Sequence, residues 1–193
     1  MRLRLFGVAL CVLIGAGCGS TRASTINDVA GDYRLSENPK MGLIIVSTRF
    51  STDCKNGENP SANLGFMDSH AMYSGVSEIP LNDPAIEQAF QAPPGHFSVK
   101  SLFEGTYRLR HLEVKNGPSL YRETRTTFDV VAGKAVYLGE IHVRLTHCDA
   151  TPSVTTSVSD QWARDSKLFE QKMKNVRADE VIMRLLAGPA AKQ

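Results

Sequence analysis

The sequence predicts a mainly β fold, an antiparallel β-sandwich followed by one or two C-terminal helices. Short segments rich in β-branched and aromatic residues alternate with clusters of Gly, Pro, Asn and Asp, which is typical of an all-β protein. Residues 140–146 alternate polar and apolar side chains, as a strand with one buried face does. After Ser159 the apolar residues take up helical spacing.

The clearest predicted strand is the segment MGLIIVSTRF at residues 41–50, because it is rich in β-branched residues and turn residues flank it. Residues 79–90 contain Pro80 and Pro84, so this segment is expected to be an edge strand or a loop. A fainter candidate covers residues 63–73. Further strands are expected at 96–102, 106–115, 124–131, 135–147 and 151–158.

Two of these strands change phase along their length, which predicts bends. Gly139 lies where the alternation of the 135–147 strand shifts, and this indicates a β-bulge. Between residues 107 and 114 the apolar positions also switch, from Tyr107 and Leu109 to Leu112 and Val114.

The C-terminal part is predicted to be helical. Ser159 is the expected N-cap of the first helix, on which one apolar face carries side chains spaced seven, four and three residues apart, namely Trp162, Phe169, Met173 and Val176. A second short helix is expected over residues 179–186, before Gly188 and Pro189. An apolar stripe of this kind indicates core packing.

The first eighteen residues have the layout of a secretory signal peptide. Arg2 and Arg4 precede an uncharged run at residues 5–14, and small residues then lead to Cys18. The apolar run is too short to span a bilayer stably, since about 20 apolar residues are needed.

The segment Ile14-Gly15-Ala16-Gly17-Cys18 resembles the lipobox that the bacterial lipoprotein signal peptidase cuts. The resemblance implies cleavage before Cys18 and acyl chains on that cysteine, although Leu is commoner than Gly at position 15. Gly19 replaces the Asp that retains such proteins at the inner membrane, so the outer membrane is implied. The alternative is an ordinary secreted protein with a chance cysteine at the junction.

The expected organisation is therefore a signal peptide at residues 1–17, a lipidated cysteine with a flexible tether at 18–28, and one periplasmic domain at 29–193. Removal of Arg2 and Arg4 leaves 20 basic against 20 acidic side chains. A neutral chain of this kind argues against nucleic acid as a partner and against electrostatic attachment to anionic lipid. The lipid on Cys18 is then the expected means of membrane attachment.

Two segments, residues 97–109 (FSVKSLFEGTYRL) and residues 128–141 (FDVVAGKAVYLGEI), share a pattern of strand and glycine turn. They resemble the carboxypeptidase-regulatory or prealbumin-like β-sandwich of many small bacterial lipoproteins. The first matches that family's strand, Gly-x-Tyr turn and strand, and the second matches its closing hairpin. Gly105 and Gly133 suit tight turns, while Tyr107 and Tyr137 supply large half-buried surfaces. The match covers about 45 of 193 residues and departs from the family at Phe103-Glu104, where proline is usual. It implies a non-catalytic module.

Four cysteines are present, of which Cys11 leaves with the signal peptide and Cys18 is the expected lipid site. Cys54 and Cys148 each follow the end of a predicted strand, and in an oxidising compartment they are expected to form a disulfide. Buried free thiols or a metal site are the alternatives.

No catalytic, cofactor or metal motif is apparent in the sequence. His142 and His147 would point to opposite faces of one strand and therefore cannot share a metal ion. A catalytic pair would need a free Cys148 with a histidine folded against it, from the set His70, His96 and His111. The remaining acidic pairs are expected to be solvated surface acids, namely Asp28 with Asp32 and Asp83 with Glu87.

The sequence thus favours a non-enzymatic, lipid-anchored envelope protein that has a structural role or binds a protein or glycan partner. The loops at residues 53–63 and 116–121 are the expected binding positions, because the loops of a sandwich cluster at the ends of its sheets. The alternative function is an envelope hydrolase that acts on peptidoglycan or lipid. A third is a subunit of an envelope assembly, docked through the C-terminal helices.

Overall fold

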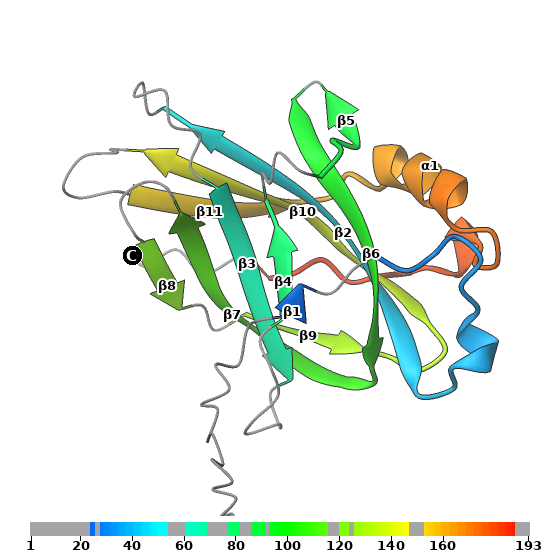
Figure 1. Cartoon of the computed structure of the whole chain (residues 1–193). Coiled ribbons are helices and arrows are strands. Elements are labelled where there is room, and N and C mark those ends of the chain that lie inside the picture. The colour runs from blue at the N-terminus through cyan, green and yellow to red at the C-terminus, as the bar shows by residue number, and fades with distance from the viewer. Residues whose placement is uncertain are drawn as a thin grey trace, which may run out of the picture.

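The structure, a computed structural model, describes residues 24–25, 28–53, 61–68, 77–81, 86–91, 93–115, 120–123, 126–146 and 153–187. In these ranges the chain is mainly β, with two six-stranded sheets and one α-helix (Figure 1). The β7 sheet has the order β1 (Ser24–Thr25), β4 (Ser77–Pro80), β3 (Ser61–Asp68), β7 (Gly105–Lys115) and β8 (Leu120–Glu123), and β9 (Thr127–Val130) also pairs with β7. The β10 sheet has the order β11 (Ser153–Ser159), β10 (Ala135–Thr146), β2 (Met41–Thr52), β6 (Pro94–Phe103) and β5 (Phe90–Gln91), and β12 (Ile182–Met183) also pairs with β10.

An apolar core lies between the two sheets, because both contribute buried side chains to it. The β7 sheet supplies Leu64 and Phe66, and the β10 sheet supplies Val46, Ile141 and Val143. Three aromatic rings of the β7 sheet form a cluster with centroids 5.6 to 6.2 Å apart, namely Phe66, Tyr107 and Phe128. The two sheets therefore pack face to face in a sandwich-like arrangement.

A second apolar core covers part of the outer face of the β10 sheet. Helix α1 (Trp162–Lys172) packs there through Phe169, which is fully buried, and Met173 follows directly after the helix. Val176 belongs to the same core, and Trp162 packs against it. The predicted core packing of these apolar residues is thus confirmed, whereas the helix ends at Lys172, before Met173 and Val176.

Most of the predicted strands are present. The segments expected at residues 41–50, 96–102, 106–115 and 135–147 correspond to β2, β6, β7 and β10. Among the described residues of the proline-containing segment at 79–90, strand structure lies at its two ends, in β4 and β5. Strand β8 was missed, since it begins inside the segment expected to be a loop.

Both predicted phase changes are confirmed. The register between β10 and β2 shifts between Tyr137 and Glu140, and Gly139 has a positive φ of 94°. In β7 the register against β3 shifts where Gly65 faces His111 and Phe66 faces Leu109. Each shift inserts an extra residue into the strand and turns the following side chains to the other face.

Three details of the prediction are wrong. Strands β2 and β10 pair in parallel, so the sandwich is not antiparallel throughout. The segment 128–141 is not a hairpin, because β9 pairs with β7 while β10 pairs with β2, and the chain crosses from one sheet to the other at Gly133. Tyr137 is fully buried rather than half-buried.

The C-terminal helices also differ from expectation. Ser159 ends β11, and the first helical amide, that of Trp162, is capped instead by Asp160, whose Oδ1 accepts its hydrogen bond at 2.8 Å. The expected second helix is a 3-10 turn (Ala178–Glu180) followed by β12, which runs parallel to β10. Pairing with the open edge of β10 satisfies the backbone of this segment, so tertiary contact overrides its helical pattern.

The N-terminal part of the described chain runs along the β10 sheet. The Val29 amide donates to the carbonyl of Val99, and Asp28 forms ion pairs with Lys100 and Lys172. Two residues of the segment expected to be a tether, Ser24–Thr25, form β1 and pair in parallel with β4. Cys18, Cys54 and Cys148 lie outside the described residues. Within the described ranges, no helix combines the length and the apolar character needed to span a membrane.

The bulge at Gly139 yields a stability prediction. A Cβ at this position would lie 2.9 Å from Val158 Cγ1 and 3.0 Å from the Ser159 carbonyl oxygen, in addition to the strain of the positive φ. Gly139→Ala should therefore lower the free energy of unfolding by about 3 kcal/mol. Urea denaturation followed by circular dichroism measures this change.

Gly133→Ala is the matched control, since Gly133 also has a positive φ but would place its Cβ in open space. This variant carries the backbone strain alone, about 1 kcal/mol. An equal loss of stability in the two variants would contradict the crowding argued for Gly139.

Candidate functional site

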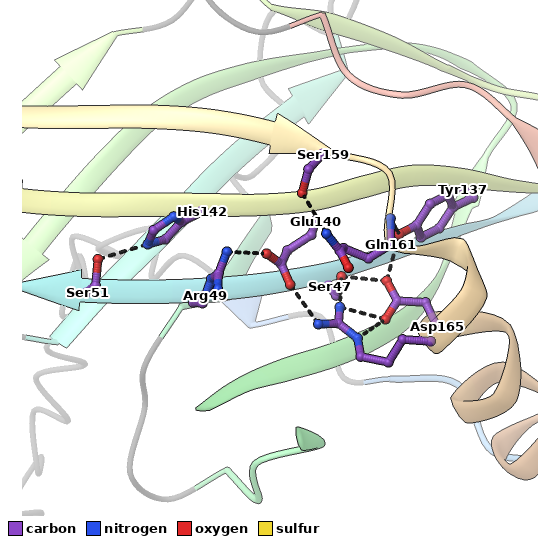
Figure 2. A network of polar contacts seen from close by, with 10 residues as sticks. Ser47, Arg49, Ser51, Tyr137, Glu140, His142, Ser159, Gln161 and Asp165 are labelled. Carbon is purple, nitrogen blue, oxygen red and sulfur yellow. Dashed lines mark hydrogen bonds and ion pairs between the residues drawn. The ribbon is translucent and has the colours of Figure 1, made fainter. Parts of the chain in front are cut away.

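Beside α1, the outer face of the β10 sheet carries a row of polar side chains from two adjacent strands, which we call the polar strip. It consists of paired residues of β2 and β10, namely Ser47 with Glu140, Arg49 with His142 and Ser51 with Arg144. Figure 2 shows the first two pairs and Ser51. Tyr137 and Glu140 share this face although they are three positions apart in the strand, because the bulge at Gly139 adds one residue between them. The strip therefore exists in this position because of the bulge.

Asp165 lies at the buried end of the polar strip. It projects from α1, is completely buried, and has both carboxylate oxygens engaged. Its Oδ1 accepts a hydrogen bond of 2.8 Å from Arg164 Nε, and its Oδ2 accepts bonds of 2.6 Å from Ser47 Oγ and 2.7 Å from the Tyr137 hydroxyl. One carboxylate thus ties α1 to both central strands of the sheet.

Glu140 is the second buried carboxylate, with its side chain 1% exposed. It lies between two guanidinium groups, with Oε1 2.8 Å from Arg49 Nη2 and Oε2 2.8 Å from Arg164 Nη1. The Arg49 contact is an ion pair without an aligned hydrogen bond, since Glu140 Oε1 has no hydrogen-bond partner in the described part of the chain. Two carboxylates and two guanidinium groups make the network electrically neutral.

The guanidinium of Arg164 is held from a further side by an aromatic ring. Its Cζ lies 3.7 Å from the ring centroid of Phe90 in β5, which is cation–π geometry. That ring lies over Gly95, where a Cβ would approach the Phe90 ring atoms to 2.4 Å. The glycine in β6 therefore provides the space for this contact.

Burial and charge in the network shift three pKa values. Burial raises the pKa of Tyr137 far above its ordinary range, and the hydrogen bond to Asp165 adds to the effect, so the phenol stays a proton donor. Burial lowers the pKa of Arg164, but hydrogen bonds to Glu140 and Asp165 outweigh it and the pKa is raised. Burial lowers the pKa of His142, and the nearby charge of Arg49 lowers it further. These shifts keep the Tyr137 phenol protonated and the Arg164 guanidinium charged.

The other half of the polar strip is open. His142 Nε2 lies 2.8 Å from Ser51 Oγ, and Arg144 forms an exposed ion pair of 2.8 Å with Asp53. Strand β11 adds the exposed side chains of Ser157 and Thr155, which pair with His142 and Arg144. This part of the sheet presents hydrogen-bond donors and acceptors on one broad face, an arrangement that can bind a polar ligand or a protein surface.

The structure brings few of the candidate residues from the sequence into this region. His142 lies in the polar strip, whereas His96 is buried on β6 with its Nδ1 3.2 Å from the carbonyl oxygen of Glu87. The side chain of His111 and the whole of three other residues lie outside the described part of the chain, namely His70, Asp83 and His147. Most of both expected binding loops, at 54–60 and 116–119, also lies outside it.

Two acidic expectations had different outcomes. Asp32 and Glu87 are exposed, as expected for solvated acids. Asp28 is not one, because its carboxylate is largely buried between the ammonium groups of Lys100 and Lys172. Burial lowers the pKa of Lys100, and the charge of Asp28 partly offsets this. A search of the described residues finds no group of three or more His, Cys, Asp or Glu side chains that could hold a metal ion.

The sequence pattern did not predict the buried members of the network. Glu140 was assigned to the exposed polar face of β10, and Asp165, Arg164 and Tyr137 were not identified as a cluster. A signal was present, because Asp165 falls three residues after Trp162 and four before Phe169, on the apolar stripe of the helix. A charged residue on a buried stripe requires a partner.

A shallow depression of about 450 Å³ lies beyond the end of α1 and has no lining residue in common with the polar strip. Met173 and Val176 line it, together with the exposed pair Arg177 and Asp179. Its charged lining side chains balance, since Glu170 and Asp179 are matched in number by Lys174 and Arg177.

The network predicts a large stability difference between two carboxylates. Glu140→Gln removes the anion shared by Arg49 and Arg164 and should cost about 3 kcal/mol, near the low end for a broken buried pair because both arginines remain partly exposed. Thermal and urea unfolding of the purified variant measure it. The matched control is Asp179→Asn, which breaks the exposed pair with Arg177 and should leave stability unchanged. Equal effects would show that Glu140 does not hold the network.

Comparisons of the chain with protein-family models, with curated proteins and with solved structures gave no match.

Proposed function

We propose that this chain is a lipid-anchored lipoprotein of the bacterial cell envelope, with a non-enzymatic structural or binding role. The observation that carries the proposal is the order of features at the N-terminus: Arg2 and Arg4, the apolar run at 5–14, and small residues directly before Cys18. Gly19 favours the outer membrane, with the domain facing the periplasm. The lipid on Cys18 would hold the domain there, since several acyl chains anchor a protein practically permanently.

Binding of a protein or a glycan is the role that the polar strip supports. Its open half offers the Arg144 guanidinium, the His142 imidazole and the hydroxyl of Ser157 on a single face. The network below it, at Asp165 and Glu140, fixes the backbone of the same strands. Pre-ordered polar groups of this kind lower the entropic cost of binding. The ion pairs and hydrogen bonds that hold the two carboxylates support a non-enzymatic role over that of a hydrolase.

The prealbumin-like sandwich remains our proposal for the finer class of the fold. Its support is that each of the two resembling segments crosses between the sheets, at β6 to β7 and at β9 to β10. Gly105 and Gly133 lie at these two crossings and both have positive φ. A sandwich is built from such crossings, with alternate strands on either side of the core.

The anchor is tested by substitution of its cysteine. Cys18→Ala should move the protein from the membrane pellet to the soluble fraction and abolish labelling by a radioactive fatty acid, because the acyl acceptor is lost. Cys11→Ala is the control within the same segment, and it should stay in the pellet and remain labelled. A Cys18→Ala protein that stays in the pellet contradicts the proposal.

We also propose a disulfide between Cys54 and Cys148. These residues follow the ends of β2 and β10, which lie side by side in parallel, with Thr52 paired with Leu145. Adjacent strand ends bring Cα atoms within the range that a disulfide can bridge.

Thiol labelling of the denatured protein tests this bridge, since a disulfide blocks both thiols. Without reductant neither cysteine should react, and after reduction both should. Cys54→Ser should then expose one reactive thiol, at Cys148, without reductant. Two reactive thiols in the unreduced native-sequence protein would exclude the bridge.

A further inference from the structure

The end of the sandwich at which β6 terminates combines an exposed aromatic side chain with the entry of the N-terminal segment. We define the Phe103 end by the last residues of β3 and β6 and the first residues of β2, β4 and β7. Phe103 is 64% exposed, the highest value among the large apolar side chains of the described residues. Single exposed apolar side chains are normal on protein surfaces. Phe103 is of interest because of its position relative to the N-terminal segment.

The position of β1 connects this end to the proposed anchor. Ser24 and Thr25 pair with Ser77 and Glu78 at the start of β4, which adjoins the end of β3 (Figure 1). Asp68 at the end of β3 in turn pairs with Tyr107 near the start of β7. Five residues lie between Cys18 and Ser24, and the segment from one to the other spans at most roughly 20 Å. A lipid on Cys18 would therefore keep the Phe103 end close to the bilayer.

The side chains around Phe103 suit the interface between head groups and water. Phe103 pairs with Met41, and the exposed Lys40 precedes Met41 directly. Exposed Lys134 lies close by, since Gly133 donates its amide hydrogen bond to the carbonyl of Met41. Glu104 is exposed beside them, and exposed Asp129 pairs with Thr106 at the same end. Aromatic side chains favour the membrane interface, and lysines are attracted to anionic head groups.

We propose that the Phe103 end rests on the phospholipid bilayer, with Phe103 inserted among the head groups. The inference rests on the proposed lipid anchor at Cys18. Strands β2 and β10 both begin at this end and run away from it, and the polar strip lies on their later residues, from Ser47 and Glu140 onward. The lipoprotein therefore stands with its polar strip directed away from the membrane and open to partners.

Tryptophan placed at two exposed apolar positions tests this orientation. Phe103→Trp marks the proposed contact, and Ile86→Trp is the matched control, because Ile86 is 39% exposed and lies near Glu87, which contacts His96 at the opposite end of β6. Each mature protein, cleaved before Cys18 and otherwise complete, is reconstituted in vesicles of phosphatidylethanolamine and phosphatidylglycerol, with or without brominated acyl chains. The emission of native Trp162 is subtracted, and mass spectrometry establishes acylation of Cys18 beforehand.

The expected result is loss of the added emission in brominated vesicles for Phe103→Trp and little loss for Ile86→Trp. Acylated protein with an unquenched Phe103→Trp overturns the orientation and leaves the anchor standing. Equal quenching at both positions overturns it as well. A protein without acyl chains that does not bind the vesicles overturns both the anchor and the orientation.

Discussion

The bulge at Gly139 is the constraint on which the rest of the structure depends. In a regular strand Tyr137 and Gly139 would share a face, whereas one extra residue places Glu140 beside Ser47 on the face that α1 covers. The same shift directs Ile141 and the later apolar residues of β10 into the core between the sheets. A single positive φ thus sets both the composition of the core and the position of the buried charges.

The buried network fixes the position of the helix more than it stabilises the fold. Apolar contacts such as those of Phe169 tolerate small displacements, but hydrogen bonds from Ser47 and Tyr137 to one carboxylate require a single geometry. Desolvation of a charged pair offsets much of its attraction, so replacement of the whole network by apolar residues need not lose stability. Removal of one member leaves the others buried and unpaired, which is costly.

The proposed anchor, orientation and binding face form one arrangement. The N-terminal segment reaches the sandwich at the Phe103 end, through β1 of the β7 sheet. The polar strip lies on the half of the β10 sheet that is farther from this end. The ion pairs of Asp28 with Lys100 and Lys172 attach the start of the domain to β6 and to α1. A short connection and a firmly attached start would limit the directions in which the face can point.

The sequence by itself determined most of the strands, both phase changes and the apolar residues that pack around α1, because each depends on periodicity within a few residues. It could not determine that 182–183 forms a strand, since only the open edge of β10 decides between helix and strand there. It also could not place Glu140 and Asp165 in one network, because Arg164, which binds both carboxylates, joins elements that are distant in the chain. Tertiary packing decided these points, because a buried charge takes its position from the partners that surround it.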